Sequence, residues 1–417
     1  MTSKDLIKVI ITEYQRIVSS IQFIDRDYNI EDELNYVFVG LRRAGKSYLM
    51  FRQVQKLLKK ERSIDEILYF NFEDDRLANL ETSDLDLIKT CYEEMYDHKP
   101  IFFLDEIQIV PNWEKFARRL ADQNYRVFIT GSNAKMLSSE IATTLGGRYM
   151  IRNVYPFSFH EFLTSAGIDS KKKNALFHFR SEINKAFEDY FRFGGLPETL
   201  KVADKREWLS NLYQKVFFGD LISRYQIRSD FSLRVLIRKL AESVKQPSSF
   251  RRLANVVSAS GKKITTDTVI DYLNYLRESW LIFSLENFAS KLADKESNKK
   301  YYFIDNGILN LFLPDPQTFL LENLVAIQLR RLYYDNFYFY NSGVEVDFYV
   351  PEAQLAVQAC YSLSDIETYN REVNALLQLS KRLEVKKMLI ISKDEERVIS
   401  LDGVEIEVIP IWKWLLL

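Results

Sequence analysis

The chain has 417 residues, of which 47% are hydrophobic and 28% charged, so it is long enough for two to four domains with real cores. Its two cysteines, Cys91 and Cys360, exclude a disulfide framework and a cysteine-based zinc site, and they fit a reducing cytoplasm. No apolar run reaches the roughly 18 residues of a membrane span, so we expect an unprocessed, soluble, cytoplasmic protein without a membrane partner.

The first predicted elements are an amphipathic helix over residues 5–19 and a short β-prone strand over residues 35–39. The spacing G-x-x-x-x-G-K-S follows at residues 40–47, and apolar residues at helical spacing come next. Such a loop turns its backbone N–H groups towards phosphate oxygens, while its lysine adds a cation and its serine a ligand for Mg²⁺. We therefore predict an ATP and Mg²⁺ site made of Gly40, Leu41, Arg42, Arg43, Ala44, Gly45, Lys46, Ser47 and Tyr48.

A second strand over residues 67–72 and a helix over residues 82–95 lead to a third strand that ends in Asp105 and Glu106. A nucleotide hydrolase needs a carboxylate at a strand end beside the phosphate loop, where it helps to hold Mg²⁺. Asp105 fits that role together with Ser47, and Glu106 fits a general base for the attacking water. The alternative is a strand that ends in acidic surface residues.

The next strand, residues 125–130, is followed by Ser132, a polar group that could contact the γ-phosphate or the attacking water. The alternative is an ordinary helix N-cap at Ser132 or Asn133. A fifth strand over residues 149–154 completes an alternation of strands and helices. This alternation predicts a doubly wound α/β sheet with its ligand at the carboxyl ends of the strands.

The order of these motifs resembles the AAA+ ATPases, in particular one prokaryotic branch. The matching stretches are Gly40 to Ser47, Leu104 to Gln108 with Trp113, Thr130 to Leu137, Gly147-Arg148 and Tyr155 to Phe162. Further matches are Phe193 to Glu198, Asp220-Leu221, Val344 to Phe348 and Thr368 to Glu372. The resemblance covers nearly the whole chain and implies a P-loop ATPase core over residues 1–164 and a helical lid over residues 165–229.

Arg148 follows two glycines and precedes the fifth strand, at an exposed corner. The resemblance implies that it could reach a neighbouring subunit's γ-phosphate as an arginine finger, which would require self-association. The alternative is a surface arginine. We therefore predict Asp105, Glu106, Ser132 and Arg148 as the catalytic set.

Residues 230–298 carry two predicted helices joined by a glycine turn and followed by a strand, which resembles a winged helix. Residues 231–300 hold 13 Lys+Arg against 7 Asp+Glu, a balance of +6, so DNA is one partner to consider. The helix that would serve as the recognition helix, however, carries Asp267, Asp271 and Glu278 against Arg277. Its acidic face weakens the DNA interpretation.

Residues 299–417 alternate strands and helices, and Glu322, Asp347 and Gln358 resemble the acidic set of the PD-(D/E)XK nuclease fold. Cys360 stands where active members carry lysine, and residues 301–417 hold 10 Lys+Arg against 17 Asp+Glu, a balance of −7. We expect the nuclease fold without nuclease activity, with the three side chains clustered among hydrogen-bond donors rather than ions.

We therefore expect an ATPase that couples Mg²⁺-dependent ATP hydrolysis to rearrangement of its C-terminal domains, with an unknown protein partner. Two alternatives stay open at this point. One is an ATP-binding interaction module that does not hydrolyse ATP, and the presence of Glu106 argues against it. The other is an ATP-regulated DNA-binding or DNA-processing factor or nuclease, which would need the missing lysine and a basic groove.

Overall fold

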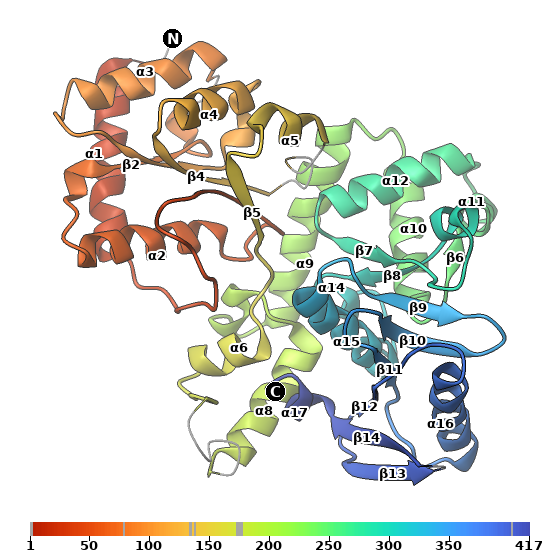
Figure 1. The fold of residues 1–417 in the computed structure, drawn as a ribbon. Helices are drawn as coiled ribbons and strands as arrows, with labels where there is room; N and C mark the ends of the chain where they lie inside the picture. Colours follow the sequence, from red (N-terminus) through yellow and green to blue (C-terminus); the bar gives the residue numbers. More distant parts are fainter. Residues whose placement is uncertain (1–2, 78–79, 133–135, 137–138, 172–177, 402) are drawn as a thin grey trace. The chain divides into compact units, whose positions relative to one another are not determined.

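The computed structural model describes residues 3–77, 80–132, 136, 139–171, 178–401 and 403–417 (Figure 1). The chain forms two compact units, residues 1–155 and residues 156–417. Within the described ranges, no helix is both long and apolar enough to cross a membrane. The finer domain boundaries at residues 165, 230 and 299 stay predictions.

The first unit is built on a five-stranded sheet in the order β2-β3-β4-β1-β5, in which all neighbouring strands are parallel. Its strands are β1 (Asn35–Val39), β2 (Ile67–Asn71), β3 (Ile101–Asp105), β4 (Arg126–Gly131) and β5 (Tyr149–Asn153). Its helices are α1 (Lys4–Ser20), α2 (Lys46–Lys59), α3 (Thr82–Glu93), α4 (Trp113–Asp122) and α5 (Ser139–Leu145). The predicted doubly wound parallel sheet is thereby confirmed.

Apolar packing explains why this sheet is central. The amphipathic helix α1 packs on β2 and contacts α2 and α3, and its buried face carries Ile7, Ile10 and Ile11. The interior strands are fully buried and aromatic, with Phe103 and Phe128 stacked 4.6 Å apart between ring centroids. Strands buried on both faces are almost continuously apolar, as this sequence is.

The register brings three strand ends to one level. Val39 of β1 pairs with Gly131 of β4, and Leu104 of β3 pairs with Ile129 of β4. The loop after β1, the acidic end of β3 and the polar end of β4 therefore lie side by side at the carboxyl edge of the sheet.

The second unit begins with helices and a small sheet. Its first helices are α6 (Phe159–Ser165), α8 (Arg180–Phe193) and α9 (Lys205–Lys215), and a π-helix over Val216–Ser223 continues α9. The helices α10 (Asp230–Glu242), α11 (Phe250–Ala259), α12 (Thr266–Glu278) and α13 (Leu292–Ser297) follow. They accompany a three-stranded sheet in the order β6-β8-β7, made of β6 (Ser248–Ser249), β7 (Ile282–Leu285) and β8 (Asn298–Phe303).

The rest of the second unit carries a six-stranded mixed sheet in the order β13-β14-β12-β11-β10-β9. Its strands are β9 (Tyr338–Asn341), β10 (Glu345–Val350), β11 (Leu355–Ala359), β12 (Lys387–Ser392), β13 (Arg397–Leu401) and β14 (Val404–Pro410). Its helices are α14 (Asn306–Asn310), α15 (Gln317–Tyr333), α16 (Ile366–Ser380) and α17 (Ile411–Trp414). The sequence analysis had proposed neither β13 nor β14.

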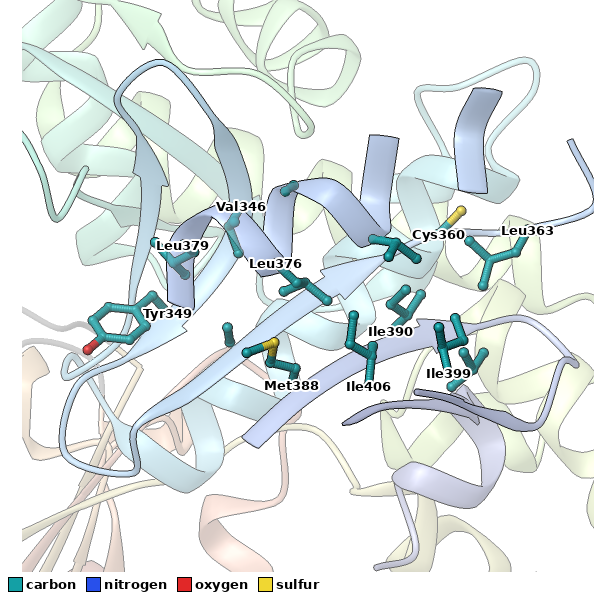
Figure 2. Packing of buried hydrophobic residues seen from close by; sticks show 14 of the residues in the cluster. Val346, Tyr349, Cys360, Leu363, Leu376, Leu379, Met388, Ile390, Ile399 and Ile406 are labelled. Carbon is teal, nitrogen blue, oxygen red and sulfur yellow. The ribbon is translucent and has the colours of Figure 1, made fainter. Parts of the chain in front are cut away.

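Figure 2 shows how helix α16 closes one face of this sheet. Leu376 and Leu379 on α16 belong to one buried cluster with Val346 of β10, Ile390 of β12 and Ile406 of β14. The cluster fixes α16 against the sheet by burial of apolar surface. Side chains on β10 and β11 are thereby held in one orientation.

Candidate nucleotide-binding site

The loop after β1 has the geometry of an anion cradle. Gly45 has a φ of 98°, which is strained for any residue with a Cβ, and it is the N-cap of α2 without a side-chain hydrogen bond to the helix. A Cβ on Gly40 would lie 2.1 Å from the Val154 carbonyl oxygen. Both glycines are therefore required, and the uncapped N-terminus of α2 presents N–H groups to an anion.

Lys46 lies almost fully buried at the start of α2, with 4% of its surface exposed. Its Nζ donates to the carbonyl oxygens of Gly40 at 3.2 Å and Leu41 at 3.3 Å, and it lies 3.4 Å from Glu106 Oε1. The ammonium is thus fixed inside the loop beside the acidic end of β3. A buried cation held by neutral carbonyl oxygens can accept stronger anionic partners such as phosphate.

Asp105 is buried at the end of β3 and accepts three hydroxyl hydrogen bonds. Ser47 Oγ donates to Asp105 Oδ1 at 3.1 Å, Tyr69 OH donates to Oδ2 at 2.6 Å, and Thr130 Oγ1 also donates to Oδ1. Burial raises the pKa of Asp105, and the Glu106 charge adds to this effect, while the three hydroxyls oppose it. The predicted pairing of Ser47 with Asp105 is present.

Glu106 stands at a φ of 56°, a left-handed conformation that turns its side chain back towards Lys46. Gln108 Nε2 donates to its Oε2 at 2.5 Å, and the Ser132 backbone N–H donates to the same oxygen at 3.2 Å. Burial alone would raise the pKa of Glu106, but Lys46, Gln108, Arg42 and the Ser132 contact outweigh burial and lower it. The carboxylate therefore stays ionised at neutral pH.

Ser132 brings an uncommitted hydroxyl to the same place. The residue is 2% exposed, and its Oγ has no hydrogen-bond partner in the part of the chain that the structure describes. A buried hydroxyl without a partner costs free energy unless a ligand or water satisfies it. The next described helix, α5, begins at Ser139, and Asn133 and Leu137 lie outside the described residues.

A buried arginine that the sequence analysis did not single out supports the loop from behind. Arg26 is 4% exposed, and its two terminal nitrogens donate at 2.8 Å to the carbonyl oxygens of Ala44 and Tyr155. Ala44 belongs to the phosphate loop, and Tyr155 follows β5. Arg26 therefore fixes the loop relative to the sheet edge, because each carbonyl is held by a charged donor.

The remaining predicted residues lie around this centre. Arg42 pairs with Glu73 at 2.8 Å, and the Tyr48 ring is 43% exposed at the start of α2. Arg148 does not join the buried cluster, because it forms an ion pair with Asp122 and donates to the Gly146 carbonyl at 3.2 Å. Its action across a subunit interface stays a prediction.

The donor set at the carboxyl edge fits a nucleotide with a hard divalent cation. Within the described residues no group of three or more His, Cys, Asp and Glu side chains is arranged around a metal position. Mg²⁺ is commonly held by one or two protein oxygens together with substrate phosphates, so one carboxylate and one hydroxyl suffice. A parallel sheet with this loop defines a P-loop nucleotide-binding protein of the AAA class.

Comparison with known proteins agrees with this class. Residues 33–163 match a family model described as "AAA domain", and residues 184–318 match one described as "Domain of unknown function (DUF8612)". The uncharacterized protein MJ1544 of Methanocaldococcus jannaschii is 34% identical over 429 residues, which cover 99% of this chain and 95% of that protein. An uncharacterized protein of Haemophilus influenzae is 29% identical, with 98% of this chain and 99% of that protein covered. The chain belongs to the same family as MJ1544, and its residues 33–163 match the AAA domain model.

Two solved structures match this chain at low sequence identity and low TM-score. The Walker-type ATPase PABY2304 of Pyrococcus abyssi has a TM-score of 0.43 at 13% identity, with 75% of this chain and 96% of that chain covered. The Aeropyrum pernix ORC1 protein, solved in complex with DNA, has a TM-score of 0.30 at 13% identity, with 76% and 93% covered.

The predicted carboxylates of the second unit do come together. Gln358 Oε1 accepts from the Asp347 backbone N–H at 2.8 Å, and both Glu322 and Asp347 lie 3.3 Å from the Nζ of Lys300. The expectation of hydrogen-bond donors in place of ions is therefore wrong, because Lys300 supplies a buried ammonium. The sequence carries no sign of this contact, because Lys300 lies 22 residues from Glu322 and 47 residues from Asp347.

Proposed function

We propose that the protein hydrolyses ATP at the carboxyl edge of the first sheet and uses the nucleotide state to move its second unit. Lys46 and the N–H groups of the loop would hold the β- and γ-phosphates, and Ser47 with Asp105 would hold Mg²⁺. When bound, Mg²⁺ supplies positive charge that neutralises the phosphates. The observation that carries the proposal is the distance of 3.4 Å between Lys46 Nζ and Glu106 Oε1. It places the proposed general base next to the loop that would hold the phosphates.

The chain's own groups account for the proton and the orientation of the attacking water. Glu106 accepts a proton from water as the water oxygen attacks the γ-phosphorus and the bond to the bridging oxygen breaks, which gives ADP and inorganic phosphate. Gln108 and the Ser132 N–H orient the Glu106 carboxylate. The Ser132 hydroxyl is then available to the γ-phosphate or to the water.

A separation of roles tests this site. Lys46→Ala should abolish or severely weaken ATP binding, whereas Glu106→Gln should keep binding and lose turnover by about 10²–10⁴-fold, as expected for loss of a general base. Lys59→Ala, at the exposed end of the same helix, is the matched control and should change neither quantity. Binding is measured by calorimetry and turnover by phosphate release.

Equal loss of binding in Lys46→Ala and Glu106→Gln would contradict the assigned roles. Normal binding with no phosphate release from the wild-type protein would favour the non-hydrolysing interaction module. Both outcomes are visible in the same pair of measurements.

The coupling part of the proposal draws support from contacts inside the second unit. Asp305, which follows β8, accepts from the backbone N–H groups of Gly195 and Gly307, both at 2.8 Å. Asn306 Nδ2 donates at 3.0 Å to the carbonyl of Phe191, at the end of α8, and to that of Leu320, on α15. The predicted lid helix α8 is thereby tied to the C-terminal sheet region.

Close packing makes the region around Asp305 and Asn306 rigid. A Cβ on Gly195 would lie 2.3 Å from the Phe157 carbonyl oxygen, and one on Gly307 would lie 2.2 Å from the Phe193 carbonyl oxygen. Arg331 of α15 also donates to the Pro156 carbonyl. A movement of the lid that follows the nucleotide would therefore carry the C-terminal region with it, because packed backbones transmit displacement.

Hydrogen exchange tests the coupling. An ATP analogue should change amide protection in α8 and in α14–α15 together, and Asp305→Ala should confine the change to α8 while ATP binding is kept. Asp315→Ala, an exposed carboxylate nearby, is the control. A nucleotide-dependent change that never reaches α14–α15 in the wild-type protein would contradict the coupling.

A second candidate function is DNA binding by residues 231–300. Arg251, Arg252, Lys262 and Lys263 are exposed at the start of α11 and in the turn after it, although α12 exposes Asp267 and Asp271. Contacts of this kind would be non-specific and salt-dependent. A gel shift at two salt concentrations tests this function. If residues 231–300 bind DNA, the double variant Lys262→Ala/Lys263→Ala should bind it more weakly than the wild-type protein.

A further inference from the structure

The second unit contains a set of charged side chains beside a large cavity, in which Lys300 and Glu322 are buried, Asp347 is partly buried and Glu345 is exposed. The cavity has a volume of about 960 Å³ and is lined from α15, β10, β11 and α16, including Glu322, Glu345, Asp347 and Gln358. None of these residues belongs to the proposed ATP site. Their carboxylates would be unstable as a group without a compensating positive charge.

Lys300 supplies that charge from β8. It is completely buried, and its Nζ lies 3.3 Å from Glu322 Oε1, 3.3 Å from Asp347 Oδ1 and 3.3 Å from Glu345 Oε1. The three carboxylates come from an α15 residue and two β10 residues. The ammonium therefore lies at the point where the three carboxylates converge.

Several other polar atoms of the cluster have protein partners. Tyr302 OH donates to Glu322 Oε1 at 2.9 Å, and the Ala359 N–H donates to Asp347 Oδ2 at 3.0 Å. The Gln358 side-chain amide forms two hydrogen bonds: its Oε1 accepts from the Asp347 N–H, and its Nε2 donates to the Glu345 carbonyl oxygen at 3.2 Å. A metal ion would have to displace these contacts as well as the ammonium.

We propose that Lys300 is a built-in cation that takes the place of a divalent metal ion in this cluster and makes it metal-independent. Mg²⁺ requires several oxygen ligands at about 2.0–2.1 Å in nearly octahedral geometry, and a fixed ammonium among the same oxygens excludes it by volume and by charge. The cluster therefore provides no bound metal ion for metal-assisted hydrolysis in the neighbouring cavity.

The electrostatics of the cluster agree with a permanent ammonium. Burial lowers the pKa of Lys300, but Glu322, Asp347 and Glu345 outweigh burial and raise it. Burial, with the Asp347 charge, raises the pKa of Glu322 to about 7, and the Lys300 ammonium opposes that rise. Removal of the ammonium would leave carboxylates that attract either protons or a metal ion.

Metal binding with and without the ammonium tests the proposal. The measurements use the full chain carrying Ser47→Ala, without nucleotide, so that the ATP site contributes no metal. Lys300→Met should gain Mn²⁺ affinity by at least about tenfold, because a unit charge next to the metal position is lost. Mn²⁺ should raise its unfolding temperature, and adding Asp347→Asn should remove both gains. Lys299→Met, the neighbouring lysine that pairs with Glu286 and Glu296, is the matched control and should gain neither.

The outcomes separate the possibilities. A folded Lys300→Met protein without a gain in Mn²⁺ affinity would overturn the proposal. If that variant does not fold, the Ser47→Ala protein with Lys300 intact decides, because Mn²⁺ binding there that disappears with Asp347→Asn would also overturn it. Intact plasmid after incubation of the wild-type protein with Mg²⁺ or Mn²⁺ and ATP is the third expected result, and cleavage that is lost in Asp347→Ala would contradict it.

Discussion

Each unit of this protein buries a lysine that contacts at least one carboxylate, and the two sites differ in which polar groups remain available to a ligand. Lys46 contacts two neutral carbonyl oxygens and one carboxylate beside an uncapped helix N-terminus and the uncommitted hydroxyl of Ser132. Lys300 contacts three carboxylates, and Tyr302 and the Ala359 N–H donate to two of them. The first arrangement leaves a buried hydroxyl and helix N–H groups for a ligand, whereas the second already holds its own positive charge. Unused polar groups, more than the presence of charges, distinguish a binding site from an internal ion cluster.

The largest expected effect is the loss of stability on removal of the buried ammonium. Lys300→Met should destabilise the second unit by about 3–5 kcal/mol, because it leaves the buried Glu322 carboxylate without its counter-ion. Lys46→Met should cost less in the absence of nucleotide, because Glu106 keeps the Gln108 and Ser132 N–H donors. Native-state hydrogen exchange of β8 and β1 measures each effect locally. Equal costs at the two lysines would remove the distinction between the clusters.

The same cluster should make stability depend on pH. The folded-state pKa of Glu322 is about 7 against an ordinary value of 4.5, so between these values the folded protein holds a proton that the unfolded chain releases. Stability should therefore fall as the pH rises from about 4.5 to about 7, by about 1–3 kcal/mol. Asp305, whose pKa burial raises to about 6, contributes in the same direction. The Glu322 contribution is the difference between wild type and Glu322→Gln in urea unfolding, and identical pH slopes would contradict it.

The uncommitted hydroxyl should affect turnover without affecting stability. Ser132→Ala removes a buried hydroxyl that has no protein partner in the described structure, so its cost in folding should be near zero. Turnover should fall by about 10–100-fold if the hydroxyl contacts the γ-phosphate or the attacking water. Phosphate release and thermal unfolding of the same preparation measure both. A helix N-cap role would give the reverse result, a stability loss with normal turnover.

The smallest expected signal is rescue between subunits. If Arg148 acts across an interface, a mixture of Arg148→Ala and Lys46→Ala proteins should recover part of the activity that each lacks, because one subunit contributes an intact loop and the other an intact arginine. Recovery should be a modest fraction of the wild-type phosphate release rate. Arg118→Ala, which removes another partner of Asp122, is the control. An active Arg148→Ala protein and no rescue would leave Arg148 as the surface partner of Asp122.

The sequence by itself determined the parallel sheet of the first unit and the parts of the proposed ATP site. The loop over residues 40–47 and the Asp105-Glu106 pair follow apolar strands, and parallel strands place their carboxyl ends at one edge. Such local patterns predict the structure because burial and backbone geometry directly determine where an apolar strand and the loop after it lie. The strands β13 and β14 were not predicted from the sequence. Strand β13 is exposed at four of its five positions, so it shows no regular alternation of buried and exposed residues.

Only the tertiary structure decided which polar groups meet. Tyr69 on Asp105, Arg26 on the phosphate loop and Lys300 among Glu322, Glu345 and Asp347 all join residues distant in the sequence. Spacing along one strand or helix carries no information about such pairs. Cys360 predicted the loss of nuclease activity but gave no sign of a cation among the carboxylates. The fold supplies that cation from β8, because the buried Glu322 requires a partner of opposite charge.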